Sequence, residues 1–174
     1  MAHRSILLST GRLTIEEFGP ELAGSVHVTS LDEDNRRFLP DEVFDTPEAA
    51  AEMIGTLMGF YKTMDGPLVY PIFLASSAHI GHVEAVPIDE GWEIGYHIGK
   101  AYTGRGYATE AVRAFAPAML KKLSAGALYG ICVEENRASA RVLEKSGFTL
   151  EFQGVGLYQG RQRPLRRYVF RLNP

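Results

Sequence analysis

Glu93 to Glu110 reads E-I-G-Y-H-I-G-K-A-Y-T-G-R-G-Y-A-T-E, and this stretch passes from a strand to a helix through a glycine turn. Apolar residues occupy alternate positions from Trp92 to Ile98, which is the period of a strand. From Ala108 onward, the apolar residues recur at helical spacing instead. Gly104 and Gly106 lie between the two elements, where they permit a tight turn and the close approach of a ligand.

The glycine turn predicts an anion site. A turn that leads into a helix directs several unpaired N–H groups, and the positive end of the helix dipole, toward one point. Such a point binds a phosphate or a pyrophosphate. The dinucleotide-binding fingerprint is excluded, because its third glycine would fall at Thr109. The P-loop is excluded because no Gly-Lys-Ser/Thr follows.

The bulk composition is that of one globular domain, which we expect to span residues 1–174. The chain is 45% apolar and 22% charged, with no run of the ~20 apolar residues that a membrane span needs and no secretory signal at its start. Cys132 is the only cysteine, so no internal disulfide can form and a cytoplasmic setting is expected. Because Cys132 lies in an apolar run, we expect a buried, inert thiol.

Charge is distributed unevenly along the chain. The net charge of −3 argues against a general nucleic-acid binder. The last 14 residues nevertheless hold five arginines and no acid. These arginines form either a solvated hairpin face or a substrate patch, and a substrate patch would favour an acidic or carboxylate-bearing substrate.

The order of elements predicts an α+β fold. Cap and turn signals give a strand, helices, three strands, a helix, a strand, a helix and two strands, with helix starts at Thr46-Pro47 and Asn136. Pro71 is expected to place its strand at a sheet edge or a bulge. The whole is an α/β/α sandwich around a mixed, mainly antiparallel sheet of about seven strands, with about four helices. Strands 92–99 and 128–133 should pair in parallel, because a helix joins them.

A second motif, V-E-E-N-R-A-S-A-R-V-L-E-K-S-G-F, runs from Val133 to Phe148. With Glu93-Ile94-Gly95-Tyr96 and the turn Gly104 to Ala111, it resembles the GNAT N-acetyltransferase superfamily, in particular its RimJ/RimL-like ribosomal-protein N-terminal acetyltransferases. The chain departs from the superfamily at Thr103, where Gln or Arg is frequent, and at Leu143, where many members carry a tyrosine general acid.

The resemblance implies the GNAT fold, with a sheet that splays between the strands at 92–99 and 128–133. It also implies acetyl-CoA as the donor and a primary amine as the acceptor. The Ile98 N–H would donate to the thioester oxygen. The expected coenzyme-binding residues are Gly104, Arg105, Gly106, Tyr107, Ala108 and Thr109 at the turn, His97 and Ile98 at the splay, and Asn136 and Ser139 on the following helix.

Proton transfer requires further groups. An amine with a pKa of ~10.4 is mostly ammonium at neutral pH, so a general base is useful. Glu84 and Glu93 are the candidate bases, with His97 as an alternative, whereas His79 and His82 are expected on the surface. Ser139 is the general acid that the resemblance implies. In the competing interpretation, Ser139 is only a first-turn serine that hydrogen-bonds to the backbone of its own helix.

The leading hypothesis is an N-acetyltransferase that moves acetyl from acetyl-CoA to a protein N-terminal amine or a small-molecule amine, by direct attack in a ternary complex. Two alternatives remain: an acyl-CoA sensor without turnover, and an acyltransferase for longer acyl chains. No metal, membrane or nucleic-acid partner is expected, and a homodimer is possible by the resemblance.

Overall fold

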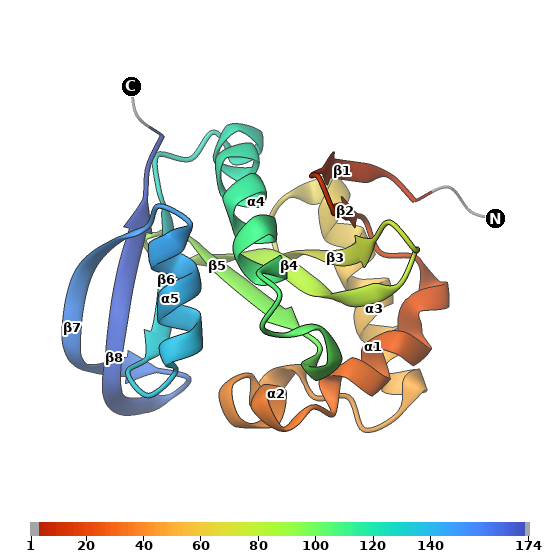
Figure 1. The fold of residues 1–174 in the computed structure, drawn as a ribbon, viewed down its shortest axis with the longest axis horizontal. Coiled ribbons are helices and arrows are strands. Elements are labelled where there is room, and N and C mark those ends of the chain that lie inside the picture. The colour runs from red at the N-terminus through yellow and green to blue at the C-terminus, as the bar shows by residue number, and fades with distance from the viewer. Residues whose placement is uncertain (1–3, 173–174) are drawn as a thin grey trace.

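The protein, seen in a computed structural model that describes residues 4–172, is built on an eight-stranded sheet with five α-helices (Figure 1). The strands are β1 (Ile6–Ser9), β2 (Leu13–Glu16), β3 (Leu68–Leu74), β4 (His79–Ile88), β5 (Gly91–Ile98), β6 (Leu128–Val133), β7 (Thr149–Tyr158) and β8 (Arg161–Phe170). The α-helices are α1 (Ala23–Ser30), α2 (Glu33–Phe38), α3 (Pro47–Thr63), α4 (Tyr107–Leu123) and α5 (Arg137–Lys145). Short 3-10 helices cover η1 (Pro20–Leu22), η2 (Pro40–Glu42) and η3 (Lys100–Tyr102).

The predicted α+β class and mixed sheet are confirmed. The strand order is β1-β2-β3-β4-β5-β6-β8-β7, and each neighbouring pair is antiparallel except β5–β6. The sheet has one strand more than the expected seven, because the turn at Gly11 and Arg12 separates β1 from β2. The fifth helix is α2, a short helix between α1 and η2.

Helices pack on both faces of the sheet and bury two cores. The larger core lies between α4 and α5 and one face, where Phe115 and Leu143 pack against inward residues such as Tyr70 and Val83. The smaller core joins α3 to the other face, where Val69 contacts it. Successive residues of a strand point to opposite faces, so Val69 and Tyr70 belong to different cores. Figure 1 shows α4 and α5 in front of the sheet, α1 and α3 beside its β3–β4 part, and α2 below the end of β5.

Pro71 occupies an interior strand, which corrects the expectation of an edge strand. β3 lies between β2 and β4. Pro71 is tolerated there because it comes one residue before Ile72, where the pairing of β3 with β2 begins. The register of β3 against β4 also shifts between Ile72 and Phe73, so the bulge part of the expectation is met.

The sheet opens between β5 and β6. These two strands pair in parallel at a single position, Glu93 with Tyr129, whereas β4 and β5 pair along eight positions. Beyond Glu93, β5 runs toward Ile98 and the glycine turn without a partner on this side. Nothing in the described part of the chain is a helix long and apolar enough to cross a membrane.

Candidate active site

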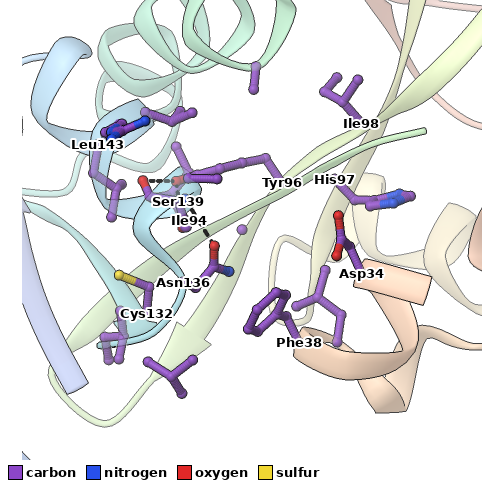
Figure 2. A pocket seen from close by; sticks show the side chains of 18 of the residues that line it. Asp34, Phe38, Ile94, Tyr96, His97, Ile98, Cys132, Asn136, Ser139 and Leu143 are labelled. Carbon is purple, nitrogen blue, oxygen red and sulfur yellow. Dashed lines mark hydrogen bonds between the residues drawn. The ribbon is translucent and has the colours of Figure 1, made fainter. Parts of the chain in front are cut away.

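A cleft of about 800 Å³ passes through the gap between β5 and β6. It is lined by the glycine turn at the start of α4, by the first turns of α5 and by carboxylates on β4 and β5. Figure 2 shows that Tyr96, Ser139 and Asn136 face one another across the cleft, with Asp34 and Phe38 of α2 on its far side. Several of the predicted residues therefore line one space.

The glycine turn leaves a row of backbone donors free. Gly104 has φ +75° and Gly106 has φ +80°, left-handed conformations that favour glycine. Gly106 is the N-cap of α4, and no side chain caps the helix. Within residues 4–172, the amides of residues 104–109 find no backbone or side-chain acceptor, and the first helical bond is Glu110 N to Gly106 O. The free amides and the positive end of the helix dipole therefore have the arrangement that the predicted anion site requires.

Arg12 and Thr10 hold this turn in place, a contact that the sequence analysis did not foresee. Arg12 donates through Nη1 to Arg105 O at 3.1 Å and through Nε to Glu110 Oε2 at 2.6 Å, and Thr10 Oγ1 donates to Glu110 Oε1 at 2.6 Å. Burial acts to raise the pKa of Glu110, but these hydrogen bonds outweigh it and lower the pKa. The turn between β1 and β2 thus braces the start of α4. We call Thr10, Arg12 and Glu110 the α4 clamp.

Strand register decides which backbone groups of β5 face the gap. Gly99 N donates to Ile80 O on β4, and successive N–H groups along a strand point to opposite edges. The N–H groups of Tyr96 and Ile98 therefore point into the gap. The backbone N–H and C=O groups of His97 point to β4 instead. We therefore assign to Tyr96 the backbone contact with a ligand that was expected at His97.

The expected pair on α5 has a third member, Tyr96. Asn136 caps the helix by accepting from Ser139 N at 3.1 Å, which confirms the predicted cap. The hydroxyl of Tyr96 donates to Ser139 O at 2.9 Å and lies 2.8 Å from Ser139 Oγ, so Ser139 Oγ–H is the donor in that second contact. Tyr96 had been counted only as a strand residue, although the strand period already placed its side chain on the same face as Ile94 and Ile98.

Cys132 lines the cleft from β6, but its thiol is not activated. The side chain is buried, as predicted. Burial raises the pKa of the Cys132 thiol to about 11, with the Arg166 guanidinium and the Ser139 hydroxyl acting in the opposite direction. The thiol stays protonated at neutral pH, which agrees with an inert role.

The two predicted bases lie on adjacent strands, both largely buried. Burial raises the pKa of Glu93 to about 7, although the Tyr158 hydroxyl and Arg167 act to lower it. Burial and the nearby Glu42 raise the pKa of Glu84 to about 8. Glu84 pairs in register with Gly95, and a Cβ at Gly95 would lie 2.3 Å from Glu84 Oε1. The Glu84 carboxyl therefore lies across β5 beside the open part of the gap.

His79 and His82 are not surface residues, which corrects the expectation. Their strand face, which carries polar groups, is covered by α1–α3. Both ring nitrogens of His79 are buried without a partner among the described residues, and burial lowers the pKa of His79 to about 4. Burial acts to lower the pKa of His82, but the Glu42 carboxylate, at 3.0 Å from His82 Nε2, outweighs it and raises the pKa.

His97 is poorly suited to act as a base. Its side chain lies on the same covered face, 3.9 Å from Asp32 Oδ2. Burial lowers the pKa of His97 to about 4, so its conjugate acid is too strong to hold a proton taken from an amine.

Glu42, His82 and Glu84 present possible metal-ligand atoms within 4.8 Å of one another. Within this group, His82 Nε2 already lies 3.0 Å from Glu42 Oε2 as an ion pair.

The C-terminal arginines mainly pair with nearby acids. Arg167 contacts Glu90 and Glu151, and Arg171 lies 3.8 Å from Glu151. Arg163 lines the cleft, where Arg163 Nη2 lies 4.0 Å from Glu135 Oε1. The hairpin is therefore mostly a salt-bridged face.

The splayed mixed sheet, with a helix start at the mouth of the gap, is the GNAT fold, and the family match identifies the chain as an acyltransferase. The acetyltransferase (GNAT) domain family matches residues 12–149, and the chain belongs to that family.

Relatives agree with this assignment. The chain is 28% identical over 147 residues to the uncharacterized N-acetyltransferase YnaD of Bacillus subtilis (strain 168), covering 83% of each protein. Two solved structures share the fold. A GNAT-family acetyltransferase from Bacillus anthracis has a TM-score of 0.79 at 24% identity, with 94% of this chain and 97% of that chain covered. The ribosomal L7/L12 alpha-N-protein acetyltransferase RimL, in complex with coenzyme A, has a TM-score of 0.81 at 18% identity, with 97% and 98% covered.

Proposed function

We propose that this protein transfers the acetyl group of acetyl-CoA to a primary amine by direct attack in a ternary complex. One observation carries the proposal: a single cleft joins a row of free amides at the start of α4 to two buried carboxyls with pKa values near neutral. The first feature suits a pyrophosphate and the second suits a general base. A protein N-terminal amine and a small-molecule amine are both candidate acceptors, the former because one structural neighbour is a ribosomal-protein acetyltransferase.

The residues around the gap fit coenzyme A. The amides of residues 104–109 would hold its pyrophosphate, with the dipole of α4 adding to the attraction. The exposed backbone edge of β5 at Tyr96 and Ile98 offers strand-like hydrogen bonds to an amide-rich arm. Acetyl-CoA supplies the thioester that the amine attacks. The Ile98 N–H, which points into the gap, would donate to the oxygen where negative charge develops.

Two sets of residues would move protons. Glu84 lies beside the open part of the gap and takes a proton from the acceptor ammonium, with Glu93 as the second carboxyl of the pair. Their raised pKa values match this task, because a base works best when its pKa is near the working pH. On the other side, Ser139 Oγ–H would turn away from Tyr96 to donate to the leaving sulfur, and the Tyr96 hydroxyl would then turn from Ser139 O to donate to Ser139 Oγ. A thiolate with a pKa of ~8.5 needs this help only modestly.

A thiol-release assay with acetyl-CoA and a panel of amines tests the proposal. We expect release that depends on an amine, and we expect Gly106→Glu to abolish coenzyme binding because it places bulk and negative charge at the amides. Coenzyme binding without release over peptides, polyamines and simple amines would favour a sensor. Ser139→Ala should lower kcat about tenfold with little change in coenzyme affinity, and an unchanged kcat would remove its role as an acid.

A further inference from the structure

A second cavity, of about 240 Å³, lies beneath α1–α3 on the face of the sheet that is opposite α4. Its walls are mainly apolar side chains, namely Phe18, Val26, Phe44, Ala50, Met53, Ile54, Leu57 and Val69. Its inner wall is shared with the active-site cleft, because Asp41, Glu42, Glu84, Val86 and His97 line both. The apolar cavity therefore begins beside Glu84, the proposed general base.

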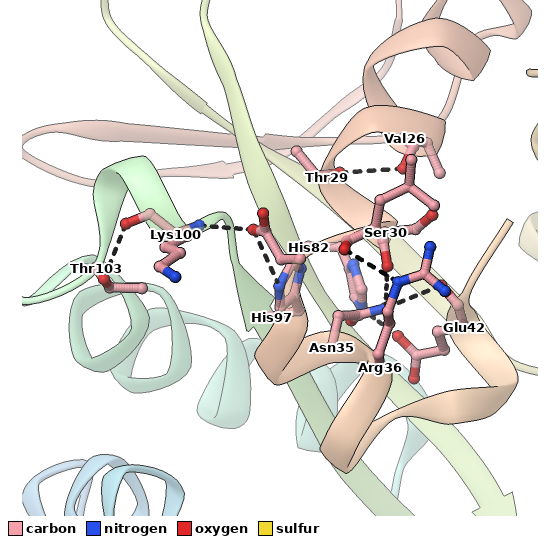
Figure 3. Close-up of polar contacts among 12 residues, drawn as sticks. Val26, Thr29, Ser30, Asn35, Arg36, Glu42, His82, His97, Lys100 and Thr103 are labelled. Atoms are coloured by element: carbon pink, nitrogen blue, oxygen red, sulfur yellow. Dashed lines mark hydrogen bonds and ion pairs between the residues drawn. The ribbon is translucent and has the colours of Figure 1, made fainter. Parts of the chain in front are cut away.

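The acidic part of this shared wall is fixed by a buried amide. Asn35 is 1% exposed, and its Nδ2 donates to Ser30 O at 3.0 Å and to Glu42 O at 3.1 Å. This holds the η2 segment against β4, where Glu42 pairs with His82 (Figure 3). The sheet and the helical layer thus present two carboxyls, Glu42 and Glu84, at the junction of the cleft and the cavity.

The charges at the junction select the ligand. His79 and His97 are neutral at pH 7 because burial lowers the pKa of each to about 4. The positive charge of His82 is already opposed by Glu42. No free cation of the described chain therefore lines the cavity to receive a carboxylate, whereas an ammonium group would lie beside the Asp41 carboxylate and the Glu84 carboxyl, which its positive charge would help to ionise.

We propose that the acceptor is a primary amine with an apolar side group and no carboxylate beside the amine, held with its nitrogen at Glu84 and its side group in the cavity beneath α1–α3. The cavity exceeds the ~150 Å³ that takes up benzene, so it accommodates one aromatic ring with a short linker. This inference rests on the proposed acetyl transfer and adds the chemical class of the acceptor.

Matched amines test the ligand side. Turnover with acetyl-CoA is measured for 2-phenylethylamine, for ethylamine, which lacks the ring, and for phenylalanine, which adds a carboxylate. Burial of one apolar side group contributes ~1.5–3 kcal/mol. We therefore expect kcat/KM for 2-phenylethylamine to exceed that of each of the other two at least tenfold. Equal values for 2-phenylethylamine and ethylamine, or higher values for spermidine or for peptides with Ser or Ala N-termini, would overturn the proposal.

Matched variants test the cavity. Ala50 is fully buried and lines the cavity, whereas Ala51 is exposed on the same helix. Ala50→Leu should raise KM for 2-phenylethylamine at least tenfold and leave ethylamine unaffected, while Ala51→Leu should change neither. Val26→Phe, with the exposed Val28→Phe as its control, repeats the test from α1 in case Ala50→Leu does not fold. Equal KM values within both pairs would contradict the assignment.

Direct binding separates this inference from the proposed function. Ligand-observed NMR measures whether 2-phenylethylamine binds to the protein, and whether Ala50→Leu abolishes binding. Binding that is lost in Ala50→Leu, without acetylation of any amine, would support the cavity and contradict acetyl transfer. Acetylation of other amines, without any binding of 2-phenylethylamine, would support acetyl transfer and overturn the cavity assignment.

Discussion

Glu84 and Glu93 show how position in a sheet can turn an ordinary carboxyl into a base for neutral pH. Glu84 lies on the strand face beneath α1–α3, and Glu93 lies beside Tyr158, so their charged forms lose water, and burial is the main cause of each raised pKa. Glu84 also faces the charges of Glu42 and Glu93, which raise its pKa further. The sequence placed both residues on the correct strands. It could not show their burial, because the groups around them come from distant segments, the helices of residues 23–63 for Glu84 and Tyr158 for Glu93.

Replacement of Glu84 should therefore affect rate and pH dependence together. A base acts when deprotonated, so kcat/KM of the native enzyme should rise with pH and level off above about 8, the pKa of Glu84. We expect Glu84→Gln to lower kcat about 100-fold and to remove this rise. Glu93→Gln should shift the rise to lower pH, because it removes a negative charge that raises the pKa of Glu84. A pH profile that is identical in Glu84→Gln and the native enzyme would exclude Glu84 as the base.

Gly95 is predicted to affect the rate of catalysis, because its lack of a side chain leaves space for the Glu84 carboxyl. A Cβ at Gly95 would meet Glu84 Oε1 at 2.3 Å, so Gly95→Ala must displace the carboxyl from the gap. We expect kcat to fall about tenfold with little change in coenzyme affinity. A double-mutant cycle provides the control: in the Glu84→Gln background, Gly95→Ala should have almost no further effect on kcat. Additive losses would show that Gly95 acts by another route.

At the scale of elements, local signals identified most of the site's supports. Asn136 caps α5 as predicted, and the glycine turn leads into α4 at Tyr107. The final hairpin turns at Gln159 and Gly160, both in the left-handed region that such tight turns use. Contacts between distant elements were missed. Thr10 and Glu110 are 100 residues apart, and neither flanking sequence indicates that the β1–β2 turn reaches α4.

The α4 clamp should be needed for coenzyme binding more than for folding. Glu110→Gln removes a charged acceptor of three hydrogen bonds from Arg12 and Thr10, which fix the glycine turn. We expect the dissociation constant for coenzyme A to rise about five- to tenfold and the free energy of unfolding to fall by about 1 kcal/mol. Calorimetry and urea unfolding measure the two effects. Glu151→Gln, at an exposed ion pair with Arg171 that lies outside the cleft, is the control and should change neither. A clamp variant that binds coenzyme as the native protein does would refute this role.

At the scale of the whole molecule, the sequence predicted the order of the elements. It predicted the face of the sheet beneath α4 better than the opposite face. The α4 face is built by local apolar periodicity, which is visible in the chain. The opposite face carries His79, His82, Glu84 and Glu93, a polar pattern typical of a solvent-exposed strand face. It is buried because α1–α3 pack over it. Glu42 reaches His82 only through the path of the chain after α2, which no local pattern specifies.

This buried polar face should make stability depend on pH in a defined direction. Glu84 and Glu93 have raised pKa values in the folded state, so their contribution is fully present below their unfolded pKa of ~4.3 and is lost as pH rises through about 7 and 8. The pKa of His82 is also raised, so it acts in the same direction. His79 and His97 have lowered pKa values, so their contribution is present above ~6.5 and is lost as pH falls toward about 4.

The carboxyl effect dominates above pH ~6.5, because His79 and His97 are neutral in the folded state there and lose their remaining charge in the unfolded state soon above that pH. From there to pH 8, the free energy of unfolding should fall by about 2 kcal/mol, since each unit of pKa shift corresponds to ~1.4 kcal/mol. Urea unfolding at half-unit pH intervals measures this decline. In the double variant Glu84→Gln/Glu93→Gln the decline should be at least halved, because the two carboxyls that must ionise in a covered layer are gone. A native protein whose stability is constant or rises from pH 6.5 to 8 would show that these carboxyls are not buried as the fold places them.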